Sequence, residues 1–287
     1  MRVAVIGGTG RMGKWFTRYF IAYNHDVAIF GRDSKKVRRV AEDMGAKTLN
    51  SLEDCKNSEV IVIAVPIYAT PKYIEQIAPK LKKSTTLIEI TSIKEGVMAV
   101  LKKVKNGSVL SIHPLFGPGA NIKAVNRYAI VPVLDSAKEK SSFKKLFPKS
   151  EVLVVQAGEH DIAMAKVLSL THFMNALFLK TIGENTDDIS KLSGTTFGIQ
   201  LALAMGVMHD EPKQLASLQV QNPHFKDVLN EMIKNAREWQ SLVAEGKQDM
   251  LSAKYNEIKS AIEKKKAFRE SYDKMYAMFR SLQKGEY

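Results

Sequence analysis

Hydrophobic positions in the first half of the chain form short apolar runs that alternate with amphipathic segments. The runs predict buried strands because they are short, rich in Val, Ile and Leu, and bounded by polar residues. They lie at residues 2–7, 26–30, 59–64, 86–90, 108–112, 128–133 and 152–155. Segments with helical periodicity lie at residues 11–23, 34–44, 71–80 and 137–146. This alternation predicts an α/β fold with a mostly parallel, doubly wound sheet, in which the later strands can be antiparallel.

From Glu159 onward the hydrophobic pattern is helical throughout. The helix predicted over residues 160–182 has apolar side chains on nearly all sides, at Ile162, Met164, Val167, Leu168, Leu170, Phe173, Met174, Leu177, Phe178 and Leu179. A helix with so little polar surface is buried in a large core or in a subunit interface. We therefore expect a sheet domain over residues 1–157 and an all-helical domain over residues 158–287 that forms a homodimer.

The first predicted strand leads into the motif Gly8-x-Gly10-x-x-Gly13 and a predicted helix. In this strand, turn and helix context the motif is typical of a Rossmann-type dinucleotide site. Gly8 makes the tight turn, Gly10 lets the pyrophosphate approach the backbone, and Gly13 allows close helix packing. The phosphates then face the free N–H groups of the helix N-terminus. The expected cofactor contacts are Gly8, Thr9, Gly10, Arg11, Met12 and Gly13, with Val65 and Pro66 at the end of another strand.

The end of the second predicted strand bears on the choice of cofactor. Arg32 stands where the adenosine ribose lies in this fold, and an arginine there pairs with the 2′-phosphate of NADP. Ser34 and Lys35 can add contacts. We therefore expect NADP. The alternative interpretation of these basic residues is a solvated start of the next helix. Asp33, one residue after Arg32, leaves NAD as an alternative cofactor.

Composition is that of a globular protein, with 287 residues, 45% of them hydrophobic and 25% charged. The net charge of +13 is spread over lysines that alternate with acids, so we expect an attraction for acidic substrates and no nucleic-acid site. The single cysteine, Cys55, excludes an internal disulfide and a cysteine-cluster metal site. We see no apolar run of membrane-spanning length and no signal peptide before the first strand. We therefore expect a cytoplasmic protein that does not bind membranes.

One histidine stands in a stiffened turn after the strand 108–112. The segment His113-Pro-Leu-Phe-Gly-Pro combines a fixed φ at proline with the close backbone approach that glycine allows. Such a turn can aim an imidazole, which exchanges a proton near neutral pH. A structural turn residue is the alternative interpretation of His113 alone.

Six motifs together resemble the prephenate and arogenate dehydrogenase family in order and spacing. They are GGTGRMG at 7–13, TSIK at 91–94, HPLFGP at 113–118, EHD at 159–161, LTH at 170–172 and LSGTTFGIQLALAMG at 192–206. The resemblance implies the oxidative decarboxylation of prephenate to 4-hydroxyphenylpyruvate in tyrosine biosynthesis, or of arogenate to tyrosine. It implies a stand-alone dehydrogenase of the archaeal type.

The resemblance also implies roles for single residues. His113 matches the catalytic histidine that accepts the hydroxyl proton, and Ser92 matches a serine that holds this hydroxyl. His172 matches a histidine of the substrate pocket, with a core histidine as the alternative. Lys94 is a candidate contact for a substrate carboxylate or a surface lysine at a helix start. His160 and Asp161 are expected to cap the long helix.

The chain departs from the family pattern at Gly198, where bacterial members have a carboxylate-binding arginine. The substrate's second carboxylate must then meet a lysine, Thr195, Thr196, His172 or a residue of the partner subunit. Two other functions stay open. One is a nucleotide-binding regulator that has lost catalysis. The other is an unrelated NADP-linked reductase. Such an enzyme needs a catalytic lysine, and Lys166 and Lys180 lack the motif expected around it. The deazaflavin-dependent reductases share only the glycine turn and the end of the second strand with this chain.

Overall fold

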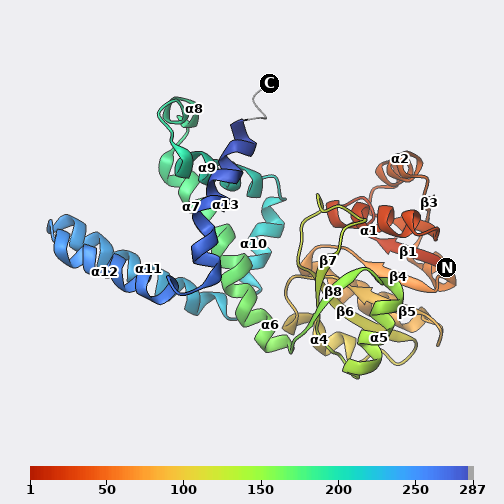
Figure 1. Ribbon diagram of the computed structural model, residues 1–287. Helices are drawn as coiled ribbons and strands as arrows, with labels where there is room; N and C mark the ends of the chain where they lie inside the picture. The colour runs from red at the N-terminus through yellow and green to blue at the C-terminus, as the bar shows by residue number, and fades with distance from the viewer. Residues whose placement is uncertain (284–287) are drawn as a thin grey trace. The chain divides into compact units, whose positions relative to one another are not determined.

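The protein is described by a computed structural model over residues 1–283, and it divides into two compact units (Figure 1). The first unit comprises Met1–Met164 together with Val220–Asn222. The second comprises Ala165–Gln219 and the described chain from Pro223 onward. A sheet fills the first unit and the second is all helical, which confirms the expected fold class.

The sheet of the first unit has eight strands in the order β3-β2-β1-β4-β5-β6-β7-β8. The strands are β1 (Arg2–Ile6), β2 (Asp26–Phe30), β3 (Lys47–Thr48), β4 (Val60–Ile63), β5 (Thr86–Glu89), β6 (Ser108–Pro114), β7 (Asn126–Ile130) and β8 (Ser150–Val154). Neighbours pair in parallel except β6 and β7, which are antiparallel. The strand order reverses beside β1, so the carboxyl ends of β1 and β4 form the crevice where ligands bind in such sheets.

Each face of the sheet is buried under its own helices. The helices and short helical turns of this unit are α1 (Arg11–Ala22), α2 (Ser34–Met44), η1 (Leu52–Asn57), η2 (Ile67–Ala69), α3 (Thr70–Ile77), η3 (Ala78–Lys80), α4 (Glu95–Leu101), α5 (Ser136–Leu146) and α6 (Ala157–Met164). Val3 and Val5 join the core formed with α1, α2 and α5, while Ala4 and Ile6 join the core formed with α3 and α4. Alternate residues of a strand therefore belong to two different cores. Because both sets are buried, the strands are continuous apolar runs in the sequence.

Four elements of the first unit were not predicted: β3, η1, η2 and α4. β3 has two residues and α4 has seven. Elements this short do not repeat a hydrophobic period often enough to be recognised. α4 also contains Gly96, a residue that is unfavourable in helices.

The long apolar helix of the sequence is continuous over Ala157–Ile182. It consists of α6, a π-helical stretch η4 (Ala165–Leu170) and α7 (Thr171–Ile182). Within the single chain much of its apolar surface is exposed, including 57% of Val167 and 44% of Met174. The single chain therefore does not bury this helix in a core of its own, and burial in a subunit interface stays a prediction.

By length and composition alone this helix could also cross a membrane, since the mean hydropathy over 18 of its residues is 1.5. That finding corrects the statement that no segment of membrane-spanning length occurs. One such helix is weak evidence for a membrane protein, because apolar interface helices have the same composition.

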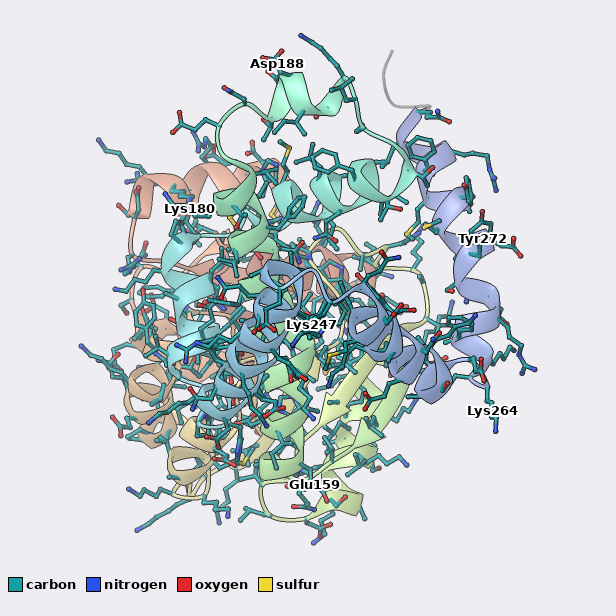
Figure 2. All side chains as sticks on the ribbon, turned by 90° about the vertical axis from the view of Figure 1, so that its left-hand side faces the viewer. Glu159, Lys180, Asp188, Lys247, Lys264 and Tyr272 are labelled. Carbon is teal, nitrogen blue, oxygen red and sulfur yellow. The ribbon has the colours of Figure 1, made fainter. Side chains whose placement is uncertain are left out.

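The remaining helices of the second unit are α8 (Thr186–Ser190), α9 (Thr195–Val207), α10 (Pro212–Val220), α11 (Phe225–Ala244), α12 (Gln248–Ile262) and α13 (Lys266–Gln283). α11 and α12 form a helical hairpin with Lys247 in the turn between them (Figures 1 and 2). Trp239 and Tyr255 hold the hairpin together, with ring centroids 4.9 Å apart. α7 packs on α9 through Phe178 and Phe197, whose ring centroids are 5.8 Å apart.

Candidate active site

The glycine-rich loop between β1 and α1 brings backbone close to backbone. Gly7 has a φ of +84°, so this residue makes the turn that we had assigned to Gly8. A Cβ on Gly8 would lie 2.6 Å from Cβ of Ile29, and one on Gly13 would lie 2.1 Å from the carbonyl oxygen of Gly7. The glycines are therefore required by the fold itself, and they bring the start of α1 against the ends of β1 and β2.

The N-terminus of α1 fits a dinucleotide pyrophosphate. Gly10 is the N-cap residue, no side chain caps the helix, and its first turn contains no acidic residue. The positive end of the helix dipole is therefore not neutralised by these groups. The end of β4 borders the loop, because a Cβ on Gly7 would lie 3.0 Å from Cγ1 of Val65. Pro66 follows as an exposed residue.

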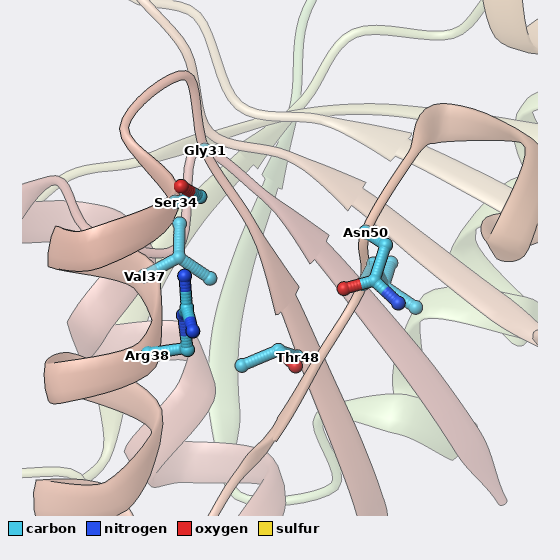
Figure 3. A pocket seen from close by; sticks show the side chains of 7 residues that line it. Gly31, Ser34, Val37, Arg38, Thr48 and Asn50 are labelled. Atoms are coloured by element: carbon cyan, nitrogen blue, oxygen red, sulfur yellow. The ribbon is translucent and has the colours of Figure 1, made fainter.

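A pocket of about 260 Å³ lies beside the carboxyl end of β2 (Figure 3). It is lined by Gly31, Ser34, Val37, Arg38, Thr48, Leu49 and Asn50. The Asp33 carboxylate accepts hydrogen bonds from the backbone N–H groups of Lys35 and Lys36, both at 3.0 Å, and so caps α2. Arg32 and Lys35 are exposed. The acidic group of this segment is thus engaged by the helix start, while the cations face solvent.

His113 lies near the end of β6, beside the end of β5. Glu89 of β5 is in register with Ser111 of β6, so the residues that follow each strand come to the same sheet edge. The turn after His113 is anchored on α1: the Trp15 indole N–H donates to the carbonyl of Ala120 at 2.8 Å. The ring of Phe116 lies 4.8 Å from that of Trp15. The turn is therefore held against the helix that carries the glycine loop.

A second histidine holds the imidazole of His113. Nδ1 of His113 lies 2.9 Å from Nε2 of His160, and Nδ1 of His160 lies 2.7 Å from Oδ1 of Asp161. All three side chains are buried. Within the described residues, His113 makes no other side-chain hydrogen bond and no buried side-chain nitrogen lacks a partner. Nε2 of His113 is therefore the accessible nitrogen.

Asp161 is fixed by the start of α4. The Lys94 backbone N–H donates to both carboxylate oxygens at 2.9 Å, and that of Glu95 donates to Oδ2 at 2.8 Å. Asn222 donates from Nδ2 to the Asp161 carbonyl at 2.9 Å. We expected His160 and Asp161 to cap the long helix, but both side chains instead face inward. Asp161 caps α4, and His160 connects Asp161 to His113.

Lys94 is fully buried under the same sheet edge. Its ammonium donates to Oε1 of Glu89 at 2.6 Å and to the carbonyl of Ile112 at 2.7 Å. Glu89 also accepts hydrogen bonds from the hydroxyls of Ser111 and Thr91. Lys94 starts a helix, as one of our two interpretations held, yet it is neither a surface residue nor open to a substrate. Its charge is used to hold β5 and β6 together.

The surroundings of His113, the candidate base, lower its pKa. Burial holds the pKa of His113 well below its usual value of 6.5, and the positive charge of Lys94 and the imidazole of His160 act in the same direction. The imidazole of His113 is therefore neutral at neutral pH, the state in which a histidine can accept a proton.

Other expected site residues lie in both units. Ser92 is half-buried in the loop after β5, at the sheet edge that carries His113. His172 is in the second unit, where its Nδ1 donates to the Leu168 carbonyl at 2.7 Å and Nε2 is the ring nitrogen left for another partner. Thr195 and Thr196 begin α9, with Gly194 as the N-cap residue. Within the described residues, no cluster of His, Cys, Asp and Glu could hold a metal ion.

Packing within the second unit does not by itself require glycine at Gly198, because a Cβ there would make only ordinary van der Waals contact. A Cβ at this position would lie 3.5 Å from Cε2 of Phe279 in α13. α13 therefore passes close to the position at which bacterial members are expected to carry arginine.

The sequence contained signals for two contacts that we missed. Arg38 follows Ser34 by four residues in a predicted helix, so the two residues lie on the same helix face and both line the pocket. His160 and Asp161 are polar residues at the start of an apolar helix, and their burial needs internal partners. The partner of His160 lies 47 residues away, which the helical pattern alone does not reveal.

Comparison with protein families gives two matches in chain order. Residues 16–147 match the model of the prephenate dehydrogenase nucleotide-binding domain. Residues 156–257 match that of the prephenate dehydrogenase dimerization domain. Among curated proteins, the chain is 30% identical over 254 residues to a probable arogenate/prephenate dehydrogenase of Methanocaldococcus jannaschii, covering 85% of this chain and 57% of that protein.

A second curated relative, the T-protein of Haemophilus influenzae, is 25% identical over 256 residues, covering 83% of this chain and 63% of its own length. The chain thus spans about three fifths of the length of these relatives.

Solved structures share the fold. The prephenate dehydrogenase of Aquifex aeolicus, in complex with hydroxyphenyl propionate and NAD+, has a TM-score of 0.75 at 14% identity, with 91% of this chain and 96% of that one covered. Synechocystis arogenate dehydrogenase has a TM-score of 0.68 at 16% identity, with 92% and 99% covered. Because a nucleotide-binding half and a helical half match in order along most of its length, the chain belongs to the prephenate dehydrogenase family.

Proposed function

We propose that this protein catalyses the NADP-dependent oxidative decarboxylation of prephenate to 4-hydroxyphenylpyruvate, a step of tyrosine biosynthesis in the cytoplasm. The observation that carries the proposal is His113: a buried imidazole with Nδ1 held by His160 and Nε2 open, at the sheet edge next to a dinucleotide loop. The family membership and the names of the curated relatives support the same reaction.

The reaction converts a ring alcohol and a ring carboxylate into an aromatic ring and carbon dioxide. When bound, the nicotinamide supplies the acceptor for the hydride that leaves the carbinol carbon. His113 takes the hydroxyl proton at Nε2, so the C–O bond can become a carbonyl as the hydride departs. The bond to the ring carboxylate then breaks, and its electrons complete the ring. Ser92 holds the same hydroxyl from the neighbouring strand end.

For the cofactor we propose NADP, held by the loop Gly8, Thr9, Gly10, Arg11, Met12 and Gly13, by Val65 and Pro66, and by Arg32, Ser34 and Lys35. Asp33 would be the natural acceptor for a ribose hydroxyl, but its carboxylate caps α2. Arg32 is exposed beside it, and Arg38 lines the adjoining pocket. This balance of charge favours a 2′-phosphate. NAD is the alternative, and the related Aquifex aeolicus enzyme was solved with NAD+.

The substrate's carboxylates require cations or hydrogen-bond donors. Lys94 is engaged by Glu89, so we propose His172, Thr195 and Thr196 for this role. The two threonines offer hydroxyls and the backbone amides at the start of α9, where the helix dipole favours an anion. These residues take the place of the arginine missing at Gly198, together with any group that a partner subunit supplies.

We propose further that the second unit forms a homodimer. The match to a dimerization domain supports this, and so does the apolar surface that the single chain leaves exposed on α6, η4 and α7, including Ile162, Val167, Met174 and Leu177. Exposed apolar patches of this kind mark association surfaces.

Arogenate is the alternative substrate, because the curated archaeal relative is named for both compounds. The test is an assay of the purified protein with prephenate or arogenate and with NADP or NAD, followed by the absorbance of the reduced nicotinamide. Prephenate with NADP should give the highest kcat/KM. No turnover of either substrate by folded protein would favour a regulatory protein or another reductase.

A further inference from the structure

The described side chains form one buried polar chain that runs from the candidate base into the protein. Its members are His113, His160 and Asp161, joined by contacts of 2.9 Å and 2.7 Å. They come from β6 and α6, and none of them lies in the glycine loop or the cofactor pocket. The question is which nitrogen of each ring carries the proton.

The hydrogen bonds between Asp161 and the start of α4 determine which nitrogen of His160 carries the proton. The Asp161 carboxylate accepts hydrogen bonds from the backbone N–H groups of Lys94 and Glu95. A carboxylate that accepts several backbone N–H bonds is stabilised in its ionised form, which is an acceptor only. Nδ1 of His160 must therefore carry the proton that points at Oδ1 of Asp161.

The remaining protons follow from this one. A neutral His160 that is protonated at Nδ1 has a lone pair at Nε2, and this lone pair can only accept. Nδ1 of His113 is then the donor, so its Nε2 has no proton and is the basic nitrogen. We propose that His160 and Asp161 are positioning residues that hold His113 in the tautomer with a basic Nε2. This rests on the proposed role of His113 as the base.

The same hydrogen-bonded side chains also stabilise the protonated state of His113. When His113 has taken a proton at Nε2, its Nδ1–H still donates to His160, and no proton needs to move along the chain. The Asp161 carboxylate is the nearest negative group in the chain, and it counters the new positive charge through His160. Glu89, the other buried carboxylate nearby, is already paired with Lys94.

The tautomer can be measured directly and without substrate. Nitrogen-15 NMR of the whole wild-type protein, with His113 assigned by comparison with His113→Asn, should find the proton of His113 on Nδ1 and none on Nε2. A His113 protonated at Nε2, or a doubly protonated His160 at neutral pH, would overturn the proposal. Because activity plays no part in this readout, the result does not depend on which substrate the enzyme uses.

Variants test the consequence for turnover. In Asp161→Asn the amide can donate to Nδ1 of His160, which reverses both hydrogen bonds and leaves Nε2 of His113 protonated. We expect kcat to fall by about 10²- to 10⁴-fold with little change in KM, as for a base in the wrong tautomer. The matched control is Glu159→Gln, which alters an exposed carboxylate on the same helix (Figure 2) and should leave kcat unchanged.

Folding is the foreseeable complication, since Asp161 also caps α4. His160→Leu avoids it by removing the ring nitrogens and leaving the cap in place. His113 should then populate both tautomers in the NMR spectrum, and kcat should fall by roughly tenfold or more. Unchanged kcat and an unchanged His113 tautomer in folded His160→Leu would contradict the proposal.

Discussion

Nζ of Lys94 lies 2.6 Å from Oε1 of Glu89, in a place where neither side chain reaches solvent. Both charges are satisfied by further hydrogen bonds: Lys94 donates to the Ile112 carbonyl, and Glu89 accepts from Ser111 and Thr91. The pair connects β5 and the start of α4 to β6. It therefore fixes the two strand ends that carry Ser92 and His113.

Breaking this pair should destabilise the protein strongly. Lys94→Met leaves the Glu89 carboxylate buried without its cation, which typically costs about 3–5 kcal/mol in the free energy of unfolding. Urea denaturation measures this cost, and Lys94→Met/Glu89→Leu should recover part of it. The matched control is Lys47→Met at the exposed Lys47–Asp26 pair, where we expect a change within about 1 kcal/mol. Equal losses in the two single variants would contradict the structural role given to Lys94.

The buried histidine should give the protein a pH-dependent stability. His113 has a folded pKa well below 6.5, while the unfolded chain takes up this proton near 6.5. The unfolded state thus binds more protons in this window, so stability rises with pH. The contribution is complete above about pH 6.5 and is lost as the pH falls toward the folded pKa.

The measurement for this prediction is the free energy of unfolding against pH, for the wild type and for His113→Asn. The contribution of His25, whose pKa is also lowered, cancels in the difference between the two curves. The difference therefore reports His113 together with its interactions with Lys94, His160 and Asp161. The same shift in the free enzyme predicts that kcat/KM stays constant from pH 8 down to about 6.5 and falls only as the pH approaches the lowered pKa of His113. A difference curve that is flat below pH 6.5 would count against the shifted pKa.

Cofactor choice should depend on the basic groups at the end of β2. Arg32→Asp removes a cation and adds an anion, so it should lower kcat/KM for NADP and shrink or reverse its advantage over NAD. A charge-assisted hydrogen bond to the phosphate is worth about 1.5–3 kcal/mol, or roughly 10- to 150-fold. Arg38→Ala should act in the same direction, because Arg38 lines the adjoining pocket. Arg39→Ala, an exposed change in the same helix, is the control. Wild-type enzyme that uses both cofactors equally well would refute the expected preference.

The oligomeric state should depend on the apolar surface of the long helix. Val167→Asp places a charge on a residue that is 57% exposed in the single chain and that we propose to be covered by a second copy. Light scattering should show a dimer for the wild type and a shift toward monomer for this variant. Leu134→Asp changes an apolar residue that is 72% exposed in the first unit and should leave the dimer intact. A wild type that is monomeric at micromolar concentration would disprove the dimer.

The sequence was informative wherever one local pattern decides the structure. β2 and α2 have the predicted bounds, because a strand of period two and a helix closed by Gly45 leave little choice of ends. The glycine motif was placed correctly between β1 and α1. The positive φ nevertheless belongs to Gly7, a detail that depends on contact with the end of β4.

Long-range pairing was beyond the sequence. Lys94 stands in a polar loop, and nothing local indicates that Glu89 and the Ile112 carbonyl bury its ammonium. His160 and Asp161 were expected at a helix end, yet their partners belong to β6 and α4. Such contacts follow from how the strands are ordered in the sheet, which hydrophobic periodicity does not encode.

The central claim is that His113 accepts the substrate's hydroxyl proton, and one comparison tests it most directly. Rates of NADP reduction with prephenate are measured for the wild type and His113→Asn, alongside NADP binding by calorimetry. We expect His113→Asn to fold and to bind NADP as the wild type does, while kcat falls on the order of 10²- to 10⁴-fold. Near-wild-type kcat in this variant would contradict the account.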